Sequence, residues 1–168
     1  MAVREERWED APGLGPIRRS VTVRRSPDDA FRILTTRVVD WWPIRTHSVA
    51  GSYREGQGVH VTDVVMEPHA GGRFYEVMSD GAEAGWGTVA DWDPPHRVTI
   101  DWKVNPNAAA LSVMEFTFTE VEPGVTRVDL EHRGWEALGD EARAEYAGPG
   151  GWTTVLPMFG RFADDEAA

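Results

Sequence analysis

The sequence contains no cysteine, and Lys103 is its only lysine among 168 residues. Without cysteine the chain can form no disulfide framework, no thiolate nucleophile and no cysteine-ligated metal site. It also lacks any apolar run near the roughly 18 to 20 residues that a membrane-spanning helix needs, and its first residues lack the apolar stretch of a signal peptide. We therefore expect a cytoplasmic protein.

Positive charge is scarce as well. The chain carries 17 basic residues against 28 acidic ones, for a formal net charge of −11. This excess repels phosphate backbones and anionic lipid head groups at long range. We expect neither a nucleic-acid partner nor a membrane partner.

Motifs of catalysis and of metal binding are also missing. The five histidines show no ligand spacing with one another or with carboxylates; they are His47, His60, His69, His96 and His132. The paired glycines Gly71 and Gly72 lead into a predicted strand, whereas a phosphate-binding loop would lead into a helix. No nucleophile elbow and no Ser-His-Asp set can be placed. We expect no metal and no cofactor, and we assign no catalytic residue, although an enzyme stays open.

The length favours a single domain with one core. Residues 1–16 are charged and then rich in proline and glycine, which indicates a flexible leader. We expect one domain over residues 17–163 and an acidic tail over 164–168.

Periodicity within this domain predicts an α+β fold. Residues 17–25 read as a strand, and Ser26 followed by Pro27 is typical of a helix start. From Gly58 onward the apolar pattern has a period of two, which predicts six strands joined by short turns in an antiparallel meander. These six segments are residues 59–66, 72–78, 86–92, 97–104, 111–121 and 126–133.

The segment GPGGWTTVLPMFGRF, residues 148–162, is the last long apolar element. Trp152, Leu156 and Phe159 recur at helical spacing, so we expect a helix that covers the apolar face of the sheet. Pro157 lacks the amide proton that would bond to Thr153, which predicts a bend or an early turn there. Our hypothesis is that this helix walls a cavity and shifts when a ligand enters.

A series of motifs resembles a known family. It consists of EPHAGGRF, GTVADWDPPHRVTIDW, GVTRVDLEHRGW and the GGW before the last helix. In this order the motifs resemble the SRPBCC (START-like) superfamily, within it the branch named after the activator of the heat-shock-protein-ninety ATPase. The resemblance implies a helix-grip fold, in which a curved seven-stranded antiparallel sheet wraps around a long C-terminal helix, with two short helices after the first strand.

The same resemblance leaves three functions open, because members of the superfamily differ in activity. The first is binding of a hydrophobic small molecule, lipid-like or aromatic, between sheet and helix. The alternatives are a module that supports a chaperone and a cavity enzyme of the polyketide cyclase or aromatase type. A homodimer is left open too.

The candidate ligand-binding residues come from two sources. Some are the alternate strand residues expected on the buried face of the sheet, and the others lie on the last helix. They are Phe74, Glu76, Trp102, Met114, Phe116, His132, Trp152, Leu156 and Phe159. These residues can also have a purely structural role. The tryptophans can fill a core, and a buried histidine is more often a hydrogen-bonded core residue than an acid or base. Glu76 faces inward only if Phe74 does, and the sequence leaves the register open at 72–78 and 85–92.

Overall fold

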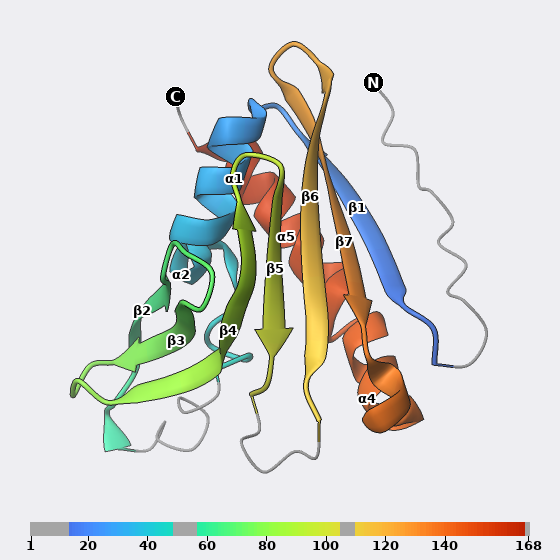
Figure 1. The fold of residues 1–168 in the computed structure, drawn as a ribbon. Coiled ribbons are helices and arrows are strands. Elements are labelled where there is room, and N and C mark those ends of the chain that lie inside the picture. Colours follow the sequence, from blue (N-terminus) through green and yellow to red (C-terminus); the bar gives the residue numbers. More distant parts are fainter. Residues whose placement is uncertain (1–13, 49–56, 105–109, 167–168) are drawn as a thin grey trace.

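The computed structural model describes residues 14–48, 57–104 and 110–166 (Figure 1). Most of the expected leader and the last two residues of the expected tail therefore lie outside the described residues. In chain order, the elements are β1 (Ile17–Val23), α1 (Pro27–Thr36), α2 (Val38–Trp41), β2 (Val61–Met66), β3 (Arg73–Met78), β4 (Glu83–Asp93), β5 (Arg97–Trp102), β6 (Ser112–Glu122), β7 (Val125–Arg133), the 3₁₀ helix η2 (Trp135–Ala137), α4 (Asp140–Ala147) and α5 (Trp152–Asp165).

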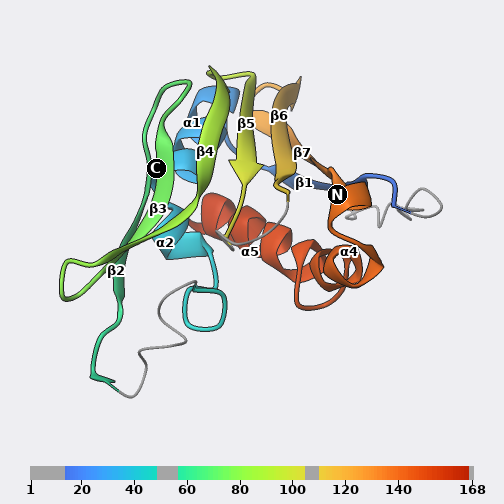
Figure 2. The ribbon, with the colours of Figure 1, turned by 60° about the horizontal axis from the view of Figure 1, so that its bottom comes forward.

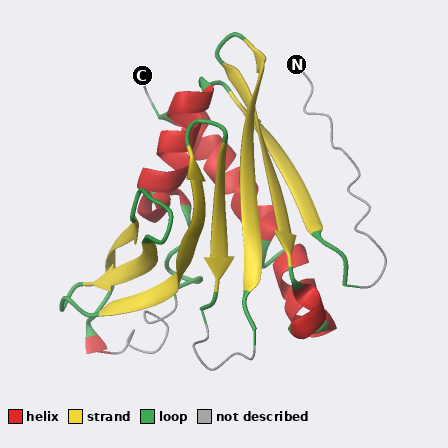
Figure 3. Cartoon of the chain, viewed as in Figure 1, coloured by secondary structure: helices red, strands yellow, loops and turns green. Residues whose placement is uncertain are grey.

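Seven strands form one antiparallel sheet in the order β1-β7-β6-β5-β4-β3-β2. The sheet is curled, and α5 runs across its concave side while α1 and α2 lie on the same side (Figures 1 and 2). Figure 3 shows the helices in red on one side of the yellow strands. The predicted α+β helix-grip fold is confirmed, including the six strands of the meander and the two short helices after the first strand.

The first helix begins where its capping signal predicts. The backbone N–H of Asp29 donates to Ser26 Oγ at 3.2 Å, and Pro27 occupies the first helical position, where its missing N–H costs nothing. Phe31 and Leu34 are buried on the face that packs on the sheet. α1 and α2 thereby cover one end of the concave surface.

Helix α5 buries Trp152, Leu156 and Phe159 as expected, and it continues through Pro157 to Asp165. The carbonyl of Thr153, which loses its partner at Pro157, belongs to an exposed residue, where water can bond to it. Gly160 lies directly against Val21 of β1: a Cβ at this glycine would sit 2.5 Å from Val21 Cγ2. The glycine thus permits a close approach of helix and strand.

The C-terminal end of α5 is tied to the turn after β1. The backbone N–H of Arg24 donates to Asp164 Oδ1 at 2.7 Å, and Arg25 Nε donates to the carbonyl of Ala163 at 2.7 Å.

Among the residues that the structure describes, no helix has the length and apolar character that crossing a membrane requires.

Candidate ligand-binding site

Five aromatic residues meet under the curved sheet, and we call them the aromatic cluster: Trp42, Phe74, Trp86, Trp102 and Trp152. The ring of Trp42 lies at its centre, with centroid distances of 5.2 Å to Trp86, 6.0 Å to Trp102 and 5.9 Å to Trp152. Phe74 stands edge-on to Trp86 at 5.1 Å. Edge-on and tilted arrangements at these distances are the favoured ones for aromatic pairs.

The aromatic cluster leaves almost no free space. The cavity beside it has a volume of about 10 Å³, enough for about one water molecule, whereas ligand sites enclose roughly 300 to 1,000 Å³. Its walls are Leu34, Val38, Trp41, Trp42, Met66, Phe74, Ile100, Met114, Phe116 and Trp152. An organic ligand can therefore enter only if a wall side chain moves out.

Trp42 is the wall residue best placed to move. It follows α2, outside any helix or strand, and with 9% of its surface exposed it is the most exposed member of the aromatic cluster. Its indole N–H donates to the carbonyl of His47 at 3.2 Å, within the same loop. The other four members are fixed on β3, β4, β5 and α5.

Among the residues that the structure describes, one fully buried carboxyl group adjoins this apolar interior. Along β3 the side chains of Phe74, Glu76 and Met78 are buried, so Glu76 faces inward with none of its surface exposed. Its Oε1 accepts from Trp86 Nε1 at 2.8 Å, and its Oε2 accepts from Ser48 Oγ at 2.6 Å. The register that the sequence left open on β3 places this carboxyl against the aromatic cluster.

A β-bulge aims Trp86 at Glu76. In the pairing of β3 with β4, Phe74 lies opposite Gly87 and Tyr75 lies opposite Gly85, so Trp86 between them has no partner on β3. An extra residue of this kind bends the strand and redirects a side chain, and bulges are common beside binding and active sites. Here the redirected indole contacts Trp42 and donates to Glu76.

His132 is a fixed, neutral group. Burial lowers the pKa of its imidazole to about 3. Trp152 Nε1, which can only donate, lies 2.9 Å from Nδ1, so Nδ1 accepts and the ring proton sits on Nε2, facing Ser112 Oγ at 2.7 Å. With a proton already on Nε2, this ring cannot take the proton of Ser112. The bond from Trp152 to His132 instead fastens α5 to β7.

A second indole bond fastens the neighbouring helix. Trp102 Nε1 on β5 donates to the hydroxyl of Tyr146 on α4 at 2.8 Å, and burial raises the pKa of Tyr146. Trp102 and Trp152 are thus bonded to α4 and β7, whereas the indole N–H of Trp42 bonds within its own loop.

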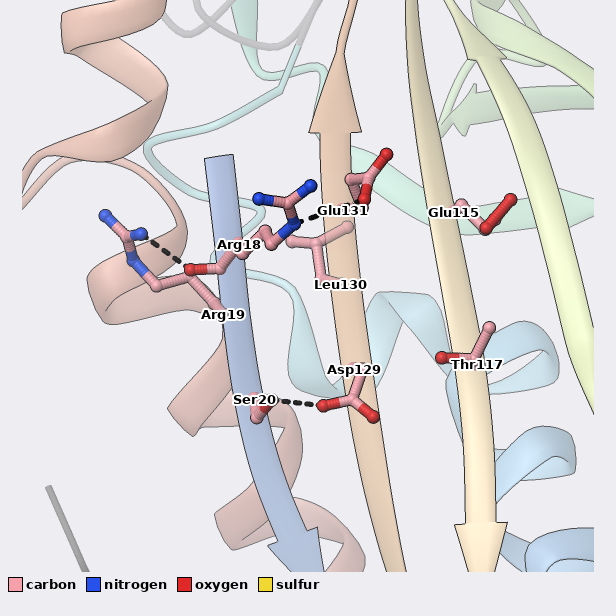
Figure 4. A pocket seen from close by; sticks show the side chains of 8 residues that line it. All are labelled: Arg18, Arg19, Ser20, Glu115, Thr117, Asp129, Leu130 and Glu131. Carbon is pink, nitrogen blue, oxygen red and sulfur yellow. Dashed lines mark hydrogen bonds and ion pairs between the residues drawn. The ribbon is translucent and has the colours of Figure 1, made fainter. Parts of the chain in front are cut away.

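A surface hollow lies elsewhere, on the outer face of β1, β7 and β6 (Figure 4). It measures about 220 Å³ and is lined by Arg18, Arg19, Ser20, Glu115, Thr117, Asp129, Leu130 and Glu131. Arg18 pairs with Glu131 at 3.3 Å, and Ser20 bonds to Asp129. Because Arg18 and Glu131 in this surface hollow already pair with each other, we place the candidate site in the interior. The described residues hold no group of three or more potential metal ligands.

Comparison with known proteins places the chain in a family. Residues 24–162 match the model of the "Activator of Hsp90 ATPase homolog 1-like protein" family. The chain belongs to this family. That match confirms the resemblance described from the sequence motifs, and it covers every element from α1 to most of α5. No curated protein matches the chain.

Solved structures similar to this member of the family include two with marked sequence identity. The anthrahydroquino-γ-pyrone synthase Txn09, solved in complex with a compound abbreviated SUM, is 31% identical with a TM-score of 0.58, and the match covers 89% of this chain and 97% of Txn09. CalC from Micromonospora echinospora, a self-sacrificing resistance protein, is 27% identical with a TM-score of 0.61, covering 91% and 96%. Protein MLL2253 from Mesorhizobium loti, at 17% identity and a TM-score of 0.63 over 91% and 99%, shares the fold.

The structure gathers part of the sequence-predicted set around the cavity. Phe74, Met114, Phe116 and Trp152 line it directly. Trp102 and Glu76 adjoin it through the rings of Trp42 and Trp86. The remaining three do not line it: His132 lies behind Trp152, and Leu156 and Phe159 are buried in the contact of α5 with its neighbours.

Sequence reasoning missed three residues: Trp42, Ser48 and Trp86. Trp42 and Ser48 lie in a loop, where no periodicity indicates which way a side chain points. Trp86 is the bulged residue, and a bulge breaks the alternation of buried and exposed side chains from which we predicted the inward-facing residues. The only available signal was the high tryptophan content, 8 in 168 residues.

Proposed function

We propose that the protein binds a hydrophobic aromatic small molecule between the sheet and α5, in space that Trp42 occupies in the unliganded state. The observation that carries this proposal is the aromatic cluster itself: four of its rings are held on regular elements, and the fifth, Trp42, comes from a loop. A planar ligand that replaces the indole of Trp42 would inherit its contacts with Trp86, Trp102 and Trp152. The lining is apolar and aromatic with few polar groups, as in most small-molecule sites.

One relative supports this class of ligand. Txn09, at 31% identity, is named as a synthase of an aromatic pyrone, whereas CalC, at 27%, is described as a resistance protein. Neither name refers to a chaperone. The chaperone-supporting role rests on the family's name alone.

A second candidate function is catalysis on the same aromatic class. The observation in its favour is the fully buried carboxyl of Glu76 beside the cluster, together with the 31% identity to a synthase. A carboxyl group in an apolar site is suited to general acid–base work on a bound ring system. Binding is common to both candidates, so it is tested first.

Naphthalene, a bicyclic hydrocarbon of about the size of indole, tests the proposal. We expect the wild-type protein to bind it in isothermal titration calorimetry. Trp42→Ala should bind it more tightly, because the ligand then no longer competes with the indole for the same space. The variant alone should lose about 3 to 5 kcal/mol of stability.

Trp92→Ala is the matched control. It also removes an indole from the folded chain, but Trp92 packs against Phe31, outside the aromatic cluster. It should lower stability without tightening the binding of naphthalene. If Trp42→Ala binds naphthalene and the wild-type protein does not, the interior is merely an engineered void and the proposed function is wrong.

A further inference from the structure

His47 joins the loop that carries Trp42 to the linker in front of α5. Its backbone carbonyl accepts from the indole N–H of Trp42 at 3.2 Å. Its ring Nε2 lies 2.7 Å from the carbonyl of Gly150, and because a carbonyl can only accept, Nε2 carries the proton and donates. One residue thus holds the indole with its backbone and the linker with its side chain.

The loop around His47 forms a compact turn over residues 43–47, which we call the latch turn. The backbone N–H groups of Thr46 and His47 both donate to the carbonyl of Pro43, at 3.1 and 3.0 Å. The hydroxyl of Thr46 lies 2.7 Å from Nδ1 of His47 and orients the ring. Because these bonds lie within the latch turn, it can move as a unit without losing them.

The linker on the other side of the contact is fixed. Thr154 Oγ1, on the first turn of α5, donates to the carbonyl of Pro149 at 2.6 Å, and the backbone N–H of Gly151 donates to the carbonyl of Gly148 at 2.9 Å. Gly151 also lies so close to the carbonyl of Tyr146 that a Cβ would not fit between them. We therefore expect an opening at this contact to move the latch turn and not the linker.

The bond from His47 to Gly150 is also easier to break than the bonds of the opposite wall. It lies near the surface, where water can replace either partner. The indole N–H of Trp152 instead donates to His132 in the buried interior, where a broken bond would leave two polar groups without water. The aromatic cluster thus opens at a smaller cost on the side of Trp42.

We propose, resting on the proposed function, that His47 is the latch of the ligand site. Its bond to Gly150 keeps the latch turn closed and Trp42 in the aromatic cluster. When this bond breaks, the latch turn moves outward, the carbonyl of His47 leaves the indole N–H, and Trp42 can turn out of the space that the ligand fills. The ligand enters between the latch turn and the linker. Since His47 acts on the ligand through Trp42, it is a positioning residue, and the fraction of open molecules limits the apparent affinity.

Titration of naphthalene into variants of His47, followed by isothermal titration calorimetry, tests this inference. His47→Ala removes the bond to Gly150 but keeps the backbone carbonyl, so the open form becomes more populated. We expect it to bind naphthalene about 3- to 10-fold more tightly than the wild-type protein does. His47→Gln should stay close to wild type, because the NH₂ group of glutamine can donate to Gly150 in place of Nε2.

Thr154→Val is the matched control. It also removes a side-chain bond to the linker, the one to Pro149, but leaves the latch turn untouched, so naphthalene should bind it as it binds wild type. Unchanged or weaker binding to His47→Ala would overturn the inference, and so would equal tightening in Thr154→Val or in His47→Gln. The proposed function would stand in each of these cases, since wild type still binds. If wild type does not bind naphthalene, the proposed function fails and the inference fails with it.

Discussion

At the scale of single residues, the neutral imidazole of His132 links stability to pH. Its pKa is about 3 in the folded protein against 6.5 ordinarily, so the unfolded chain binds an extra proton between these values. Stability from this group is complete above pH 6.5 and falls by about 1.4 kcal/mol for each unit below it. We expect His132→Gln to lose about 1 to 3 kcal/mol at pH 7 through its disturbed bonds to Ser112 and Trp152. In urea denaturation, the stability difference between wild type and His132→Gln should be about 2 kcal/mol smaller at pH 5 than at pH 7.

The exposed His96 provides the control for this residue. His96→Gln, the same substitution at an exposed position, should change stability by less than about 0.5 kcal/mol at pH 7. A penalty for His132→Gln that stays constant from pH 7 to pH 5 would mean that the buried ring takes up its proton without unfolding.

At the scale of elements, the contact between α5 and β1 depends on Gly160. Alanine favours a helix over glycine by about 1 kcal/mol, but a Cβ here would lie 2.5 Å from a methyl group of Val21, whose β-branched side chain cannot easily turn away. We expect the overlap to dominate, so that Gly160→Ala loses about 1 to 3 kcal/mol in urea denaturation. With Val21→Ala already present, the same change should instead stabilise the protein. Equal losses in both backgrounds would show that Val21 is not the cause.

At the scale of the whole molecule, the net charge of −11 competes with surface ion pairs. Exposed pairs such as Arg73–Glu83 and Arg97–Asp91 contribute only about 0 to 1 kcal/mol each. The general repulsion among acidic groups is screened by salt over a Debye length that shortens to about 8 Å at physiological ionic strength. We expect the Tm to rise by about 2 °C or more when sodium chloride is raised from about 10 to about 150 mM. A falling Tm would show that the ion pairs outweigh the repulsion.

Much of the sheet could be predicted because local periodicity determines it. Strand β6 alternates residues between a buried face, which carries Met114 and Phe116, and a more exposed face, and short turns join neighbouring strands. The pairing of β1 with β7 has no such local signature, since the two strands are far apart in the sequence. Only the family resemblance indicated it.

The candidate site was harder to predict for the same physical reason. The alternation of strand residues indicated that Phe74 and Phe116 face inward, and both line the cavity. The same alternation gives no indication of Trp86, because the bulge interrupts it. Trp42 is held by contacts with β4, β5 and α5, all distant in sequence. The residue pattern of its own loop does not predict these contacts. The near absence of free volume also follows from packing as a whole, which a sequence does not display residue by residue.

The position of β1 has a consequence for the chain during its synthesis. Its partner β7 and the helix α5 that covers it leave the ribosome well after β1. At ordinary translation rates, the stretch of about 100 residues between Val23 and Val125 takes roughly 5 to 20 s to make, and during that time β1 is an unpaired strand. An unpaired apolar strand invites aggregation, and charge on the strand opposes it. The adjacent Arg18 and Arg19 on β1 supply that charge. In the nascent chain they oppose intermolecular strand pairing before the ion pair between Arg18 and Glu131 can form.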